Sequence, residues 1–229
     1  MDVIDTMANN NRAQLTFNAD ATDLSRVDVQ AFSVVILAAG LSRRMGTVNK
    51  LLLDVGDESL LRHCVSVVNE LNACQTIVVL GHQQKIIESE IADLGVQLIV
   101  NENFSSGQQS SVLCGLKAVS ENNKATLICL SDQPLLNATH FHKLMWAFDN
   151  RPEGLHIVVP VHESKRGNPV VISETVRQQV LKSSHLDCRR YINENPDKVF
   201  WVSLNDAAYV TDVDTPEEYA ALQNLWTCF

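Results

Sequence analysis

The sequence predicts an α/β fold whose central sheet is mostly parallel. Short apolar runs rich in Val, Ile and Leu, typical of strands buried on both faces, alternate with longer segments whose apolar residues recur at helical spacing. This order favours parallel strands joined by right-handed crossovers. Polar loops with Gly, Asp or Pro follow several of the strands, where open α/β sheets bind ligands.

The first strand is predicted over residues 34–38, and its loop reaches Lys50. Small residues, including Ala39 and Gly40, allow a ligand to approach the backbone closely. Three cations suited to phosphate oxygens follow: Arg43, Arg44 and Lys50. The spacing matches neither Gly-x-x-x-x-Gly-Lys-Ser/Thr nor Gly-x-Gly-x-x-Gly. The residues alone therefore leave two interpretations open, a phosphate-binding loop and a solvated basic turn.

The remaining elements continue the alternation. Apolar runs predict further strands over 76–80, 96–100, 125–130, 157–161, 170–172 and 199–204. Helices are predicted over 59–72, 83–94, 108–120, 173–182 and 189–193, with two more starting at Asn137 or Thr139 and at Thr215. Residues 1–30 are polar and lack periodicity, so we expect a flexible or loosely docked extension before one domain over 31–229.

One acidic residue stands at the end of a predicted strand. Asp132 lies in Ser-Asp-Gln-Pro, directly after the strand over 125–130. Carboxyl ends of parallel strands share one edge of a sheet, so we expect Asp132 near the Gly40 loop, where it could hold magnesium against phosphate. An Asx turn or helix cap before Pro134 is an equally good interpretation of the position alone.

A second acidic residue, Asp214, lies in Asp-Val-Asp-Thr-Pro-Glu-Glu. On its own this pattern is typical of a helix N-terminus, and capping is its more frequent role. Two further segments have a functional and a plain interpretation. The helix start with Gly107, Ser110 and Ser111 is an anion or base contact or a simple cap. The loop Arg166-Gly167-Asn168-Pro169, taken alone, is a turn.

Composition excludes some function classes. The 229 residues carry a formal net charge of -9, which argues against nonspecific binding to nucleic acid or to an anionic membrane. No apolar stretch reaches the roughly 18 residues that span a bilayer, and residues 1–30 lack the features of a signal peptide. Six cysteines are scattered without metal-ligand spacing. We therefore expect a cytoplasmic protein.

Together these motifs resemble those of the MobA/MocA-like nucleotidyltransferases, especially molybdenum cofactor cytidylyltransferases. The resemblance rests on Leu-Ala-Ala-Gly-Leu-Ser-x-Arg-Met-Gly-x-x-x-Lys, Ser-Asp-Gln-Pro and Asp-x-Asp-Thr-Pro-Glu, and it covers about residues 34–225. Relatives that transfer guanylyl groups tend to carry Leu-Ala-Gly-Gly, so Ala39 favours the cytidylyl branch, as does Gln133. The implied fold is a Rossmann-like three-layer sandwich of the nucleotide-diphospho-sugar transferase type, and residues 31–229 would be the nucleotidyltransferase domain.

The resemblance implies an activity. The protein would transfer CMP from CTP to the phosphate of molybdopterin or molybdenum cofactor, giving the cytosine dinucleotide and diphosphate, with magnesium. A molybdoenzyme could receive the product. Guanylyl or cytidylyl transfer to another small phosphate acceptor is an alternative, and a non-catalytic nucleotide or cofactor chaperone for a molybdoenzyme is another.

The resemblance also implies roles for individual residues. Catalysis would rest on Lys50, Arg44 and Asp132, and metal binding on Asp132 and Asp214. The nucleotide would contact Leu37, Ala38, Ala39, Gly40, Ser42, Arg44, Lys50, Gly107, Ser110, Ser111 and Asp132. The acceptor would contact Arg166, Gly167, Asn168 and Pro169. The segment 184–189 departs from the family's Gly-Asp-x-Gly-Ala-Arg pattern, which leaves the exact acceptor open.

Overall fold

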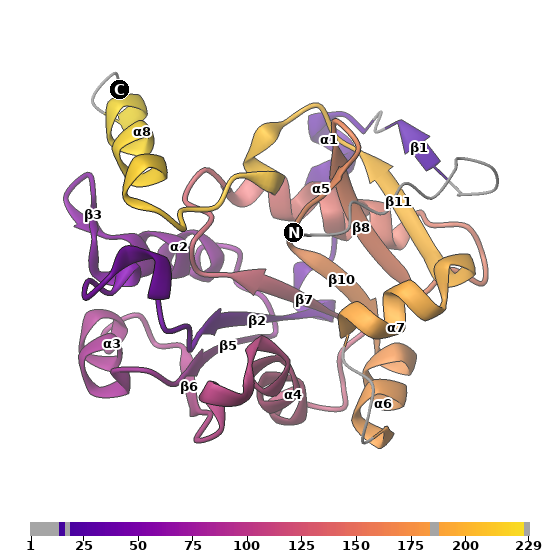
Figure 1. Ribbon diagram of the computed structural model, residues 1–229. Helices are drawn as coiled ribbons and strands as arrows, with labels where there is room; N and C mark the ends of the chain where they lie inside the picture. Colours follow the sequence, from indigo (N-terminus) through magenta and orange to yellow (C-terminus); the bar gives the residue numbers. More distant parts are fainter. Residues whose placement is uncertain (1–13, 17–18, 184–187, 227–229) are drawn as a thin grey trace.

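The computed structural model describes residues 14–16, 19–183 and 188–226. It is a three-layer sandwich in which helices cover both faces of a mostly parallel sheet, so the predicted fold class is confirmed (Figure 1). The main sheet consists of β1 (Gln14–Thr16), β2 (Phe32–Ala38), β5 (Gln75–Leu80), β6 (Gln97–Val100), β7 (Ala125–Leu130), β8 (Ile157–His162), β9 (Lys165–Arg166), β10 (Val170–Ser173) and β11 (Val199–Ser203). A separate hairpin pairs β3 (Asp54–Val55) with β4 (Glu58–Ser59).

The strand order is β1-β11-β8-β10-β7-β2-β5-β6, with β9 added to β8. All pairs are parallel except those of β9 and β10. The short connection after β8 explains the exception, because a parallel return would need a crossover of about a dozen residues or more. Parallel pairing of β2 with β7 brings the ends of these two strands to one edge, as the sequence predicted.

The helices are α1 (Ala21–Ser25), α2 (Leu60–Asn69), α3 (Gln84–Ile91), α4 (Gln108–Ala118), α5 (Ala138–Asp149), α6 (Glu174–Lys182), α7 (Cys188–Glu194) and α8 (Pro216–Trp226). Short 3-10 turns are η1 (Val29–Ala31), η2 (Arg43–Met45), η3 (Lys50–Leu52), η4 (Phe104–Ser106), η5 (Pro196–Lys198) and η6 (Ala207–Val210). Predicted helix starts agree with the structure, and Asn137, not Thr139, caps α5. Among the described helices, none has the length and apolar character of a membrane crossing.

Alternating residues of β2 supply the two halves of the core. Val34 and Ile36 pack into the cluster with α2, α3 and α5. Val35 and Leu37 pack into the cluster with α4, α6 and α7 on the other face. Every residue of β2 is buried, which is why the sequence shows a continuous apolar run there.

A glycine allows α4 to lie close to the sheet. A Cβ atom on Gly115 would come within 2.4 Å of Val35 Cγ1 and 2.9 Å of Val79 Cγ2. We expect Gly115→Ala to lower the free energy of unfolding by about 1–3 kcal/mol through overpacking. Helix propensity alone would raise stability by about 1 kcal/mol. Urea unfolding shows whether the free energy of unfolding falls or rises. Lys117→Ala, at an exposed site of the same helix, is the control.

Two short stretches of the N-terminal segment form regular structure, and the division of the chain at residue 30 remains a prediction. β1 pairs in parallel with β11. Asp20 is the N-cap of α1 and forms a capping box with Asp23, in which the side chain of each residue accepts a hydrogen bond from the backbone amide of the other. The strand forms because β11 leaves one edge of its ladder available, and a pairing between residues such as Gln14 and Trp201, 187 positions apart, leaves no local pattern in the sequence. Residues 14–16 and 21–25 are therefore regular structure. Residues 1–13 and 17–18 lie outside the described part of the chain.

A buried arginine joins two helices. Arg177 in α6 is 2% exposed, and its Nη1 donates to the carbonyl of Leu116 at 2.7 Å. Its Nε and Nη2 donate to the two oxygens of Glu174 at 2.6 and 2.7 Å. Partial burial raises the pKa of Glu174, but hydrogen bonds from Arg177 and Gln178 lower it further, so the pKa lies below its ordinary value.

We expect Glu174→Gln to lower the free energy of unfolding at pH 7 by about 1–3 kcal/mol, because Arg177 then keeps a buried charge without its carboxylate. Since the folded-state pKa of Glu174 is depressed, its stabilisation is complete above the unfolded value of about 4.3. It is lost as pH falls through the lower folded-state pKa. Urea unfolding should therefore show about the same difference from wild type at pH 7 and pH 5, and a smaller difference at pH 3.5. A constant difference would contradict this, and exposed Glu194→Gln should change little.

Candidate active site

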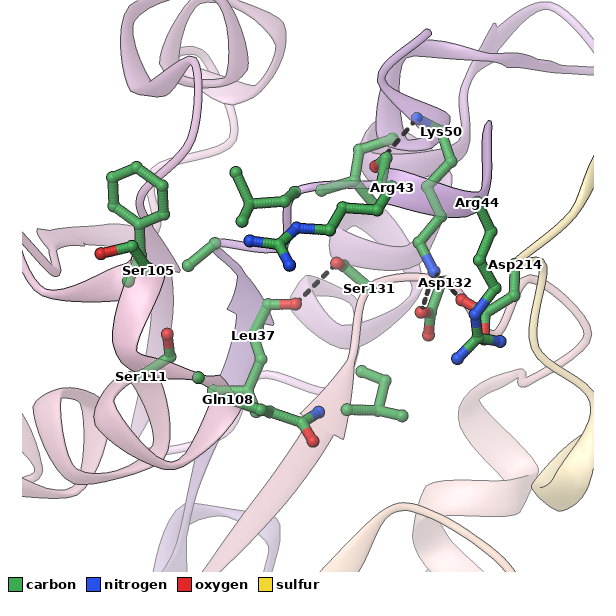
Figure 2. A pocket seen from close by; sticks show the side chains of 18 residues that line it. Leu37, Arg43, Arg44, Lys50, Ser105, Gln108, Ser111, Ser131, Asp132 and Asp214 are labelled. Carbon is green, nitrogen blue, oxygen red and sulfur yellow. Dashed lines mark hydrogen bonds and ion pairs between the residues drawn. The ribbon is translucent and has the colours of Figure 1, made fainter. Parts of the chain in front are cut away.

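A cavity of about 450 Å³ lies at the ends of β2 and β7, beside the start of α4 (Figure 2). Its lining residues are Leu37, Ala39, Gly40, Leu41, Ser42, Arg43, Arg44, Lys50, Leu51, Phe104, Ser105, Gly107, Gln108, Ser111, Leu130, Ser131, Asp132 and Asp214. Ten of these were predicted site residues. Ala38, Ser110 and the 166–169 loop were also predicted, but they do not line this cavity.

The loop after β2 is fixed by its own side chains. Ser42 has a left-handed backbone (φ 48°), and its Oγ accepts from the Lys50 amide at 3.2 Å. The Asn49 Oδ1 accepts from the Leu51 amide at 3.1 Å, and its Nδ2 donates to Gln83 Oε1 at 2.9 Å. Asn49 is 7% exposed. These bonds close the loop and hold Lys50 at the cavity, a function that sequence inspection did not assign to Asn49 or Gln83.

Lys50 joins two carboxylates that are far apart in the sequence. Its Nζ lies 2.5 Å from Asp132 Oδ2 and 2.6 Å from Asp214 Oδ1. Asp214 Oδ2 also accepts from Arg44 Nη1 at 2.5 Å. Figure 2 shows these groups together at one side of the cavity, and Ser105, Gln108 and Ser111 at the other.

The charges shift each other's ionisation. Burial lowers the pKa of Lys50, but Asp132 and Asp214 raise it more, so the ammonium ion is favoured. Burial raises the pKa of Asp214, but Lys50 and Arg44 lower it more, so this carboxylate stays ionised. Asp212 differs: burial, then repulsion from Asp132 and Asp214, raises its pKa. The carboxylates in ion-pair contact with Lys50 are those of Asp132 and Asp214. The choice of Asp214 over Asp212 as the second metal ligand remains a prediction.

The Asp132 segment is tied to its neighbours by short bonds. Ser131 Oγ donates to the carbonyl of Leu37 at 2.7 Å, which joins the end of β7 to the end of β2. The Val213 amide donates to the Asp132 carbonyl at 2.9 Å, which fixes the segment before Asp214. Ser131 is 3% exposed, and only its place in Ser-Asp-Gln-Pro could have identified it.

The start of α4 presents backbone amides to the cavity. Asn101 Nδ2 donates to Ser110 Oγ at 2.8 Å and to Ser111 Oγ at 3.0 Å. Ser110 Oγ in turn donates to the carbonyl of Gly107 at 2.8 Å. No side chain among the described residues caps the helix at Gly107. The Ser110 amide donates to the Gly107 carbonyl at 3.1 Å, which leaves the N–H groups of Gln108 and Gln109 as those that could meet an anion or a polar ligand. Contact of this helix start with a nucleotide remains a prediction.

The 166–169 loop packs against η6. The Asn168 amide donates to the Tyr209 carbonyl at 2.9 Å, and the Gly167 amide donates to the Pro160 carbonyl at 2.9 Å. A Cβ atom on Gly167 would come within 2.5 Å of the Tyr209 carbonyl oxygen, so this position requires glycine. Its predicted contact with an acceptor remains a prediction. The atypical segment 184–189 has residues 184–187 outside the described part of the chain.

Metal binding was predicted for Asp132 and Asp214. In the described ranges, no group of three or more His, Cys, Asp and Glu side chains is arranged to hold a metal ion. Asp132 Oδ1 is buried and has no hydrogen-bond partner among the described residues, so one carboxylate oxygen is available. The donor set is two carboxylates, which suits a hard divalent cation that takes its other ligands from water and phosphate.

Comparison with known proteins gives the family. The model of the MobA-like NTP transferase domain matches residues 34–199, a range that includes the Gly40 loop, Asp132 and the 166–169 loop. The chain belongs to this family. The predicted resemblance to MobA-like nucleotidyltransferases is therefore confirmed, and the branch within the family remains a prediction.

Two proteins with similar sequences carry very different names. Nicotine blue oxidoreductase of Paenarthrobacter nicotinovorans is 28% identical over 200 residues, which cover 83% of this chain and 96% of that protein. The bifunctional protein GlmU of Corynebacterium aurimucosum is 30% identical over 156 residues, or 65% of this chain. The match spans only 29% of that GlmU protein, so the likeness concerns one part of it.

Solved structures share the family's fold. A homologue of Rv0371c from Mycobacterium sp. strain JC1 superposes with a TM-score of 0.74 and 24% identity, covering 87% of this chain and 98% of its own. Rv0371C of Mycobacterium tuberculosis, solved in complex with manganese, has a TM-score of 0.69 and 20% identity, covering 84% and 97%. At these identities the likeness concerns the fold.

Proposed function

We propose that this chain transfers CMP from CTP to the phosphate of a molybdopterin-type cofactor and releases diphosphate. The observation that carries the proposal is the position of Lys50, which contacts Asp132 and Asp214 in one cavity with the Gly40 loop and the start of α4. Family membership supports nucleotidyl transfer. The proposal assigns the triphosphate to the side with Arg44 and Lys50, and the nucleoside to the side with Ser105, Gln108 and Ser111 (Figure 2).

Magnesium fits the two carboxylates. Asp132 and Asp214 would hold it, since both are hard oxygen donors and Asp132 Oδ1 is free of hydrogen bonds within the described chain. A bound divalent ion would supply neutralisation of charge on the phosphates. Lys50 would then turn from the carboxylates toward the phosphate oxygens, because Coulomb attraction favours the more highly charged group. The manganese complex of a protein with the same fold supports a divalent ion.

The reaction needs positioning and cations more than covalent chemistry. An oxygen of the acceptor phosphate forms a bond to the α-phosphorus of CTP, and the bond from that phosphorus to the bridging oxygen of the β-phosphate breaks. Diphosphate leaves with the electron pair. Arg44 and Lys50 stabilise the charge that develops on it. An ionised acceptor phosphate has no proton to lose, so no general base is required.

The sequence motifs support the choice of CTP and of a molybdopterin-type acceptor. Ala39, in the lining of the cavity, favours CTP over GTP through the resemblance to the cytidylyl branch, and Gln133 follows the same pattern. The molybdopterin-type acceptor is proposed because the sequence resembles the cytidylyl branch, whose members act on this cofactor. Transfer to another phosphate acceptor and non-catalytic carriage of nucleotide or cofactor are the alternatives.

Diphosphate release from purified protein tests the proposal. We would compare CTP, GTP and ATP, each with magnesium and molybdopterin cofactor, and expect release at least about 10-fold faster with CTP. Release with GTP alone would correct the base and keep the reaction class. Release only with a different phosphate acceptor would correct the acceptor. Tight CTP binding without release from any acceptor would favour the carrier alternative.

A further inference from the structure

One backbone carbonyl connects two segments of the site. The Tyr209 oxygen accepts a hydrogen bond from Gln133 Nε2 at 3.1 Å and another from the Asn168 amide at 2.9 Å. Gln133 directly follows Asp132, and Asn168 lies in the 166–169 loop. The carboxylate site and the predicted acceptor loop are therefore joined through a single atom.

This joint is buried and tightly packed. Gln133 is 3% exposed and Tyr209 is fully buried. The Tyr209 hydroxyl donates to the His140 carbonyl at 3.1 Å, and its ring packs edge-on against His140 at 5.1 Å. Gly167 lies directly against the Tyr209 carbonyl. A shift of Tyr209 would therefore move the 166–169 loop with it.

A second bond makes the connection rigid. The Val213 amide donates to the Asp132 carbonyl, so the segment from Tyr209 to Val213 is held to the Asp132 segment at both ends. Asp214 follows this segment directly. The side chain of Gln133 thus closes a ring formed by residues 209–213, Asp132 and Gln133. Asp214 and the 166–169 loop are both attached directly to this ring.

The carbonyl oxygen of the Gln133 side chain is evidence that this residue does more than stabilise the fold. Its Oε1 is buried and has no hydrogen-bond partner among the described residues. An unpartnered buried carbonyl oxygen is destabilising, and an apolar side chain of the same volume would avoid it. Tyr209 would still accept from Asn168. Such a replacement would remove the link between the Asp132 segment and the 166–169 loop.

We propose that Gln133 is a positioning residue that holds the 166–169 loop in register with Asp132 and Asp214, and so aligns the acceptor with the nucleotide. Its kinetic consequence rests on the proposed function. In-line transfer is sensitive to displacements of about 1 Å, which can lower the rate about 100-fold.

The test is Gln133→Met, which keeps the volume of the side chain and removes the donor. We expect kcat/KM for the acceptor to fall about 30- to 100-fold, with CTP affinity changed less than about threefold. The melting temperature should stay the same or rise. Hydrogen–deuterium exchange of peptides that contain residues 166–169 should increase about 10-fold, and exchange of the Gly40 loop should not.

The control is Gln75→Met, at the opposite end of the sheet, where the Gln75 amide donates to Gln97 and to the Ala118 carbonyl. It should leave the acceptor kinetics unchanged. The proposal is wrong if exchange of the 166–169 loop is unaffected by Gln133→Met, or if CTP affinity and stability fall together with the acceptor kinetics. If wild-type protein releases no diphosphate with any acceptor, the proposed function fails, while the exchange result still decides the function of Gln133.

Discussion

Asp132→Asn is expected to reduce diphosphate release from CTP by at least about 1,000-fold. The substitution keeps the shape of the side chain and removes the negative charge that lies 2.5 Å from Lys50. It also replaces one carboxylate oxygen with an amide nitrogen, and loss of this oxygen donor would weaken the binding of a divalent cation. The effect should be on catalysis, because Ser131 and Val213 hold this segment by bonds that the substitution leaves intact.

Binding without metal separates this explanation from misfolding. In the presence of a chelator, Asp132→Asn should bind CTP as tightly as wild type or tighter, because one negative charge facing the triphosphate is gone. In the presence of magnesium, the gain in CTP affinity that the metal provides should be lost. Isothermal titration calorimetry measures both quantities. Weaker binding under both conditions would indicate a disrupted cavity instead of a lost metal ligand.

The neighbouring acids provide a matched comparison. Asp214→Asn should lower the rate to a similar extent, because Asp214 shares Lys50 with Asp132. Asp212→Asn should keep the rate within about threefold, since Asp212 is not ion-paired to Lys50. If Asp212→Asn proves as inactive as Asp214→Asn, the assignment of Asp214 as the second acid is wrong.

Lys50→Met is expected to lower diphosphate release about 100- to 1,000-fold and to destabilise the protein at the same time. The Lys50 side chain is 11% exposed, and its removal leaves Asp132 and Asp214 facing each other without their shared cation. With discounting for partial exposure, we expect a loss of about 1–3 kcal/mol in the free energy of unfolding at pH 7. Urea unfolding and a diphosphate assay give the two readouts.

The two effects of Lys50 can be separated by a second substitution. In the double variant Lys50→Met/Asp132→Asn, one repelling carboxylate is removed, so stability should return to within about 1 kcal/mol of wild type. Activity should stay as low as in the single variants, because phosphate neutralisation is not restored. Recovery of activity along with stability would mean that Lys50 acts only as a structural counter-ion.

The pH dependence follows from the raised pKa of Lys50. A raised folded-state pKa stabilises the fold fully below the unfolded value of about 10.4, and this stabilisation is lost only as pH rises through the folded-state pKa. The charge of Lys50 contributes to the difference in the free energy of unfolding between wild type and Lys50→Met. This contribution should therefore persist from neutral pH to about pH 10 and shrink only above that pH. Urea unfolding at pH 7, 9 and 10.5 checks this order.

Several features of the fold could be predicted from local patterns. β7 has the predicted bounds, and Ser59 and Ser173 cap α2 and α6 as expected. These features depend on residues within one or two turns of each other, and hydrophobic periodicity records which face of such an element is buried. The position of Asp132 near the Gly40 loop also followed, because parallel strands end at one edge.

The contacts that complete the site were not predictable in this way. Lys50 meets Asp214 across 164 residues, and Gln133 reaches Tyr209 across 76. Neither pair leaves a spacing signal in the sequence. The family resemblance pointed to Asp214 and associated Gln133 with the cytidylyl branch, but no pattern in the sequence linked Gln133 to Tyr209 or to the 166–169 loop.

Local patterns were therefore sufficient to predict the α/β class, the strand-end loops and the chemical types of the site residues, because these features depend on composition and short-range periodicity. Three features became visible only in the folded chain: antiparallel β10 between β7 and β8, the pairing of β1 with β11, and the contact of Lys50 with two carboxylates. Strand order and side-chain pairing depend on the packing of whole layers, which fixes distances between residues that no local pattern relates.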